Sequence, residues 1–179
     1  MSQDVILGID PGTGTTAWAM LCASSGKLVG YSKINPKRNS ESTDKIIDIS
    51  MSLKYVIRGI LEKGYRIGYS AIEDQFVKAN ASSGLLLSRL TGAIAMAVFE
   101  ETGTVPAFIN QSAGKSAIGI NPKHYTESNY NKRRKQMQED MVKNCRDIFE
   151  ISPDFELQHD EAAAIAVAYK LFQNLQKAE

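Results

Sequence analysis

The chain has 179 residues, and its 21 Lys and Arg against 20 Asp and Glu residues give a formal net charge of +1 at pH 7. A hydrophobic content of 43% with balanced charge argues against disorder. No stretch approaches the roughly 20 apolar residues of a membrane span, and the first residues lack the basic start of a secretory signal. We therefore expect one domain, residues 1–179, in the cytoplasm. Near-neutral charge still permits a local basic face for nucleic acid.

The N-terminal part of the chain has the composition of three consecutive strands. Apolar runs at 4–9, 15–22 and 28–34 are separated by short turn-forming segments. Links of this kind favour antiparallel neighbours. Residues 45–63 then place apolar side chains at intervals of three and four, which predicts an amphipathic helix ended by Gly64.

The remainder alternates strands and helices. We predict a strand at 67–73, a helix rich in small residues at 82–101 and a strand at 104–109. The pattern at 110–135 is weak, a basic helix is expected to follow to about residue 150, and an Ala-rich helix occupies 160–176. This order predicts an α/β fold with a mixed five-stranded sheet, three antiparallel strands and then parallel strands, flanked by helices.

Three acidic residues stand at the ends of predicted elements. Asp10 ends the first strand, Glu73 ends the fourth, and Asp160 opens the last helix. Taken singly, they have ordinary explanations as a turn former, a solvated strand end and a helix cap. If the first and fourth strands are neighbours, the three carboxylates come together and need a counter-charge. Mg²⁺ prefers such oxygen ligands, and two ions about 3.5–4 Å apart can activate a water and stabilise the leaving oxygen of a phosphodiester.

The segments around these acids resemble the motifs of a known family. ILGIDPGTGTTAWA at 6–19, AIEDQFVKANASSGLLLSRLTGAI at 71–94 and HDEAAAIAVAY at 159–169 are similar, in order and spacing, to three motifs of RuvC-type Holliday junction resolvases. GKSAIGI at 114–120, with the basic segment after it, resembles the DNA-contacting stretch of that family.

This resemblance implies an RNase H-like fold, a homodimer and Mg²⁺-dependent nicking of four-way DNA junctions. It assigns Asp10, Glu73 and Asp160 as catalytic acids that hold two Mg²⁺ ions per active site, with Mn²⁺ as a substitute. Cutting of other branched DNA is left open. The short chain resembles a bacteriophage version of the family, which would act in the cytoplasm of its host.

One position departs from the family pattern. Three residues after Asp160 the family has Asp, whereas this chain has Ala163, which offers no oxygen ligand. Three explanations are open: Glu161 or a neighbour substitutes, the chain is an engineered inactive variant, or it is a natural weak nuclease. A non-catalytic junction-binding protein of the same fold is therefore the alternative function. An ATPase of the actin or Hsp70 kind shares the Gly-rich hairpin after the first Asp, but it needs two lobes and the chain is too short for them.

Basic and aromatic side chains predict DNA contacts. The resemblance puts Lys115 and Lys135 beside the scissile strand, and puts Phe76 where an aromatic ring stacks on an unpaired base. The basic cluster is completed by Lys132, Arg133 and Arg134. Each cation that neutralises a phosphate makes affinity fall with salt, and stacking is typically worth about 1–3 kcal/mol per base. The non-functional interpretation of the basic cluster is a solvated helix face, and that of Phe76 is a side chain that anchors its loop to the core. The helix at 82–101 is a candidate dimer surface, or else plain core.

Overall fold

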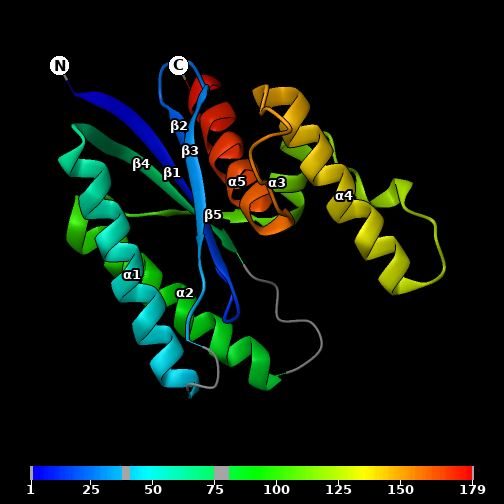
Figure 1. Ribbon diagram of the computed structural model, residues 1–179, viewed down its shortest axis with the longest axis horizontal. Helices are drawn as coiled ribbons and strands as arrows, with labels where there is room; N and C mark the ends of the chain where they lie inside the picture. Colours follow the sequence, from blue (N-terminus) through cyan, green and yellow to red (C-terminus); the bar gives the residue numbers. More distant parts are fainter. Residues whose placement is uncertain (1, 38–40, 75–80, 179) are drawn as a thin grey trace.

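A five-stranded mixed sheet with helices on both faces organises the chain (Figure 1). The structure is a computed structural model that describes residues 2–37, 41–74 and 81–178. The strand order is β3-β2-β1-β4-β5, with antiparallel pairing of β1 with β2 and of β2 with β3, and parallel pairing of β1 with β4 and of β4 with β5. The strands are β1 (Gln3–Asp10), β2 (Thr16–Cys22), β3 (Leu28–Ile34), β4 (Tyr65–Asp74) and β5 (Ala107–Asn110). The predicted mixed five-stranded sheet is confirmed.

The helices form two layers, one on each face of the sheet (Figure 1). One layer contains α1 (Ser42–Glu62) and α2 (Ala81–Thr102), whose buried aliphatic side chains share a core with β1 and β4. The other layer consists of α3 (Gln111–Ala117), α4 (Tyr130–Phe149) and α5 (His159–Gln176), with a short 3₁₀ turn, η1 (Pro122–His124), before α4. Among the described residues, no helix combines the length and apolar character needed to cross a membrane.

Helix α5 lies unusually close to the sheet because small residues face each other across the contact. All residues from Glu161 to Ala168 are buried, and five of them are alanine. At Gly8 of β1, an added Cβ would lie 2.5 Å from the carbonyl oxygen of Ala164 and 2.6 Å from the backbone nitrogen of Ala168. The first turn of α5 is thereby held at a fixed position relative to β1.

The sequence pattern failed mainly around β5 and α3. The predicted strand at 104–109 is shorter and later than expected, and the featureless start of 110–135 contains the seven-residue helix α3. This helix starts because the Asn110 side chain accepts a hydrogen bond from the backbone nitrogen of Ser112, at 2.9 Å. A helix start that depends on one side-chain cap produces no apolar periodicity, so the hydrophobic pattern of the sequence did not reveal α3.

Candidate active site

The three acids singled out in the sequence line one cavity of about 230 Å³. Ile9 of β1 pairs with Ile72 of β4 in parallel register. The next residue of each strand, Asp10 and Glu73, therefore lies at the same edge of the sheet. Asp160 enters from the first turn of α5, whose place is fixed by the close contact at Gly8. The structure thus brings together three carboxyl groups that lie far apart in the sequence.

The carboxyl groups interact strongly. Burial raises the pKa of Asp10 well above its usual range, the charges of Glu73 and Asp160 raise it further, and Lys115 opposes the shift. Glu73 is 4% exposed and accepts a hydrogen bond from Nε2 of Gln111, at 3.0 Å. The cluster of carboxylates therefore needs additional positive charge if all of its members are to be ionised.

Two neighbouring side chains hold the acids in place. Gln111, the first residue of α3, reaches Glu73 because β5 lies beside β4 and pairs Glu73 with Ile109. His159 lies one residue before Asp160, and its Nε2 is 3.0 Å from Oδ1 of that carboxylate. The sequence interpretation missed Gln111; the signal available was a polar side chain directly after a strand that neighbours the Glu73 strand.

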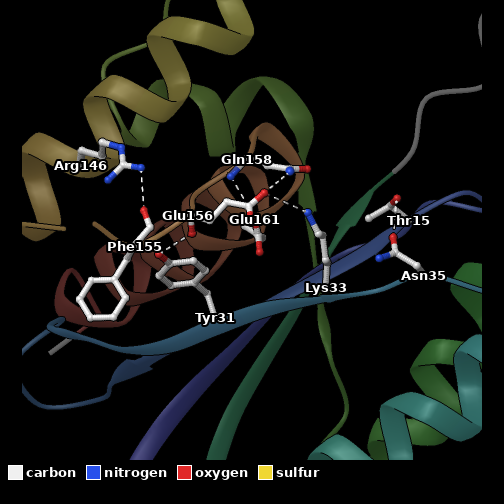
Figure 2. A network of polar contacts seen from close by, with 9 residues as sticks. All are labelled: Thr15, Tyr31, Lys33, Asn35, Arg146, Phe155, Glu156, Gln158 and Glu161. Atoms are coloured by element: carbon white, nitrogen blue, oxygen red, sulfur yellow. Dashed lines mark hydrogen bonds and ion pairs between the residues drawn. The ribbon is translucent and has the colours of Figure 1, made fainter. Parts of the chain in front are cut away.

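Ala163 lines the same cavity, one helical turn after Asp160. Figure 2 shows that Glu161 lies elsewhere, beside Gln158 and Tyr31. Its Oε2 accepts a hydrogen bond from the backbone nitrogen of Gln158, at 2.8 Å, and it lines a separate cavity of about 540 Å³ under the loop before α5. Of the explanations considered for position 163, substitution by Glu161 is therefore wrong, because the helix turns this side chain to another face.

The donor set of the cavity suits a hard divalent cation. Such ions prefer carboxylate oxygens, and a cation would relieve the repulsion that raises the pKa of Asp10. No three Asp, Glu, His or Cys side chains within 2–37, 41–74 and 81–178 already stand at ion-binding distances. The cavity thus fits a divalent cation in the chemistry of its oxygen donors, which line one shared space. To bind an ion, the carboxylates must turn toward a common centre.

Comparison with known proteins decides the family. The family model described as "Crossover junction endodeoxyribonuclease RuvC" matches residues 6–169. The chain belongs to this family. A RuvC protein of Geobacter metallireducens is 26% identical over 165 residues, which cover 91% of this chain and 88% of that relative. One from Ralstonia pickettii is 34% identical over 105 residues, covering 58% of this chain and 54% of the relative.

Solved structures share the fold of this RuvC-family chain. The structure described as Thermus thermophilus RuvC in complex with Holliday junction substrate has a TM-score of 0.71 at 16% identity and covers 96% of this chain and 95% of its own. The yeast mitochondrial Holliday junction resolvase Ydc2 has a TM-score of 0.54 at 18% identity, with 99% and 82% covered. The predicted RNase H-like fold is confirmed by these likenesses. The relatives named here come from bacteria and yeast, so they give no support to the expected bacteriophage origin.

The basic residues predicted to contact DNA fall into two groups in this RuvC-family structure. Lys115 and Arg134 line the acid-bearing cavity itself. Burial lowers the pKa of Lys115, while the nearby Glu73 and Asp10 oppose that shift. Arg134 shares its face of α4 with Met137 and Met141, which also line the cavity. The three-to-four-residue spacing of these positions was the signal that could have separated Arg134 from its basic neighbours.

The other predicted DNA-binding residues do not line this cavity or lie outside the described part of the chain. Lys135 lines an adjoining hollow with His159, and its Nζ is 3.7 Å from Oε1 of Glu139. The guanidinium carbon of Arg133 lies 5.8 Å from the centroid of the Tyr130 ring. Lys132 is exposed on the first turn of α4. Phe76 lies outside the described residues.

Proposed function

We propose that this RuvC-family protein is a divalent-metal-dependent endonuclease that resolves Holliday junctions by paired nicks and acts in the cytoplasm. In this proposal residues 1–179 form a single nuclease domain. The observation that carries it is the family match over residues 6–169 combined with one cavity that holds Asp10, Glu73 and Asp160. Neither finding alone would be sufficient, since a family match says nothing of this chain's own site and an acidic cavity has many uses.

Each side chain has a proposed role. Asp10, Glu73 and Asp160 bind Mg²⁺, or Mn²⁺ in its place, and the bound ion supplies charge that activates a water and stabilises the leaving oxygen of the phosphodiester. Gln111 orients Glu73 through the hydrogen bond described above. Lys115 lies in the electrostatic field of Glu73 and Asp10, which is the right place to neutralise a phosphate that approaches them.

DNA is proposed to approach over α3 and the start of α4. Arg134 borders the cavity, and Lys132, Arg133 and Lys135 continue the positive charge along the first turns of α4. Phosphate contacts of this sort position a duplex without reading its sequence. We propose that the geometry of the junction is recognised more than its base sequence. Stacking of Phe76 on an unpaired base stays a prediction.

We propose a homodimer formed through α2. The side chains of Leu85, Met96 and Phe99 are 54%, 55% and 46% exposed on this helix, and Gly92 lies on the same face, which permits close approach of a second helix. Apolar exposure of this extent along one face is typical of an interaction surface. A twofold dimer would match the near twofold symmetry of a four-way junction.

The alternative function, a junction-binding protein without catalysis, stays open because of one residue. Ala163 gives the cavity a methyl group where the family pattern has a carboxylate. The two functions separate in a cleavage assay on an end-labelled four-way junction, with linear duplex as the control substrate. We expect paired nicks in Mg²⁺ or Mn²⁺, none in EDTA, and a gain of orders of magnitude with Ala163→Asp.

The variant Asp10→Asn completes the test. It should abolish cleavage and leave junction binding in EDTA unchanged, because the DNA contacts proposed above come from other side chains. Tight binding without nicks in either metal, for both the unmodified chain and Ala163→Asp, would establish the non-catalytic alternative. Retained cleavage by Asp10→Asn would remove this residue from the mechanism.

A further inference from the structure

We infer that the cavity of the DNA-free protein binds one divalent cation, not the two implied by the family resemblance, and that Ala163 imposes this limit. The inference rests on the proposed metal-dependent function, since it concerns the same carboxylates. It differs from that function in being a statement about occupancy before DNA arrives.

The charge of the cavity lining supports a single ion. Three carboxylates, from Asp10, Glu73 and Asp160, face two cations, from Lys115 and Arg134. With these five groups ionised and His159 counted as neutral, the lining carries one net negative charge. One divalent ion already reverses this sign, so a second ion would enter a cavity of net positive charge. Repulsion between like charges within one cavity disfavours that step unless another anion is present.

The distribution of oxygen donors points the same way. Among the described residues that line the cavity, α5 contributes a single carboxylate, that of Asp160, and its Oδ1 is 3.0 Å from Nε2 of His159. The next position on the same helix face is Ala163, which is 8% exposed and brings no donor. Glu161 is turned away toward Gln158 and cannot replace it.

The remaining polar groups of the cavity are neutral or already engaged. The Thr15 hydroxyl donates to Oδ1 of Asn35, at 3.0 Å, as Figure 2 shows. Gln111 donates to Glu73, at 3.0 Å. A neutral oxygen also contributes less than a carboxylate to the binding of a hard cation. The described lining therefore lacks the negative charge for a second ion, which either a DNA phosphate or an Asp at position 163 would supply.

The test measures Mn²⁺ bound to the DNA-free protein, by electron paramagnetic resonance of free Mn²⁺ and by calorimetry with Mg²⁺. We expect one ion per chain, with any second site at least roughly tenfold weaker. Ala163→Asp should bind two ions with affinities within about tenfold of each other. Ala163→Asn is the matched control, because it adds nearly the same volume without charge, and it should stay at one ion.

The outcomes separate this inference from the proposed function. Two ions of similar affinity in the unmodified chain would overturn the inference and leave the proposed function intact. No bound ion in the unmodified chain would instead count against both. One ion in both Ala163→Asp and Ala163→Asn, with circular dichroism showing that both are folded, would show that position 163 does not set the limit and would also refute the inference.

Discussion

Replacing Gly8 by Ala should destabilise the protein by forcing α5 away from the sheet. The added Cβ would lie 2.5 Å from the Ala164 carbonyl oxygen, 2.6 Å from the Ala168 nitrogen and 2.7 Å from the Ala168 Cβ. Two of these atoms belong to the backbone, so no side-chain rotation can relieve the overlap and the helix itself must move. Overpacking of a core typically costs about 1–3 kcal/mol, and the rigid neighbours lead us to expect about 3 kcal/mol here.

The assay is thermal unfolding of the two glycine-to-alanine variants Gly8→Ala and Gly30→Ala. For a chain of this size, 1 kcal/mol corresponds to roughly 2–4 °C in Tm, so Gly8→Ala should lower Tm by about 6–12 °C. Gly30 also lies in a strand, but its nearest neighbour is the flexible end of Met20, at 3.7 Å, so Ala there should change Tm by less than about 3 °C. Equal Tm values for the two variants would show that the β1–α5 contact does not constrain the fold.

Three further predictions concern single side chains. Hydrogen bonds from Ser24 and Ser25 lower the pKa of Cys22 to about 6, whereas burial raises the pKa of Cys145 to about 12. Iodoacetamide at pH 7.5 should therefore alkylate Cys22 first, as followed by mass spectrometry. Equal labelling of the two cysteines in the folded protein would contradict this. Because the pKa of Asp10 is raised in the folded state, the metal-free protein should gain stability as pH falls from 7 toward the ordinary carboxyl pKa of about 4. Asp10→Asn should weaken this gain, as measured by urea titrations at several pH values. An unchanged slope of unfolding free energy against pH in Asp10→Asn would refute the prediction. Lys115→Ala should weaken junction binding in EDTA and reduce the slope of log K against log salt by about 1, and an unchanged slope would show that Lys115 contacts no phosphate.

The elements that the sequence predicted correctly are those that bury a regular apolar face. Strand β1 is buried from Val5 to Ile9 and is visible as a continuous apolar run, whereas α1 buries Ile49, Leu53, Ile57 and Ile60 and is visible by its helical period. Helix α3 has seven residues, of which Gly114 is the buried one, and its position depends on packing against α5. Tertiary contacts of this sort have no counterpart in a local pattern.

The candidate site divides in the same way. Asp10, Glu73 and Asp160 could be chosen because each lies within one residue of the end or start of an element, and because topology rules allow the first and fourth strands to be neighbours. The partners Gln111 and His159 depend on side-chain directions, which the order of elements does not contain.

The four consecutive basic residues of α4 show the same limit. Lys132, Arg133, Arg134 and Lys135 are equivalent in composition, and the phase of the helix decides which of them borders the cavity. That phase is set by Met141 and Cys145, which are buried against α5.

The acids of this site are held in place by contacts that do not involve the acids. The register of β1 with β4 fixes Asp10 and Glu73, and the contact of Gly8 with Ala164 and Ala168 fixes Asp160. The fold can therefore tolerate mutual repulsion in the absence of an ion, since its stability comes from the apolar cores on both faces of the sheet. It can equally tolerate alanine at position 163, which lines the cavity at the border of the core shared by α4 and α5. For this reason the loss of a fourth acid should change ion occupancy and rate while leaving the architecture intact, and Ala163→Asp should restore charge without the refolding of any element.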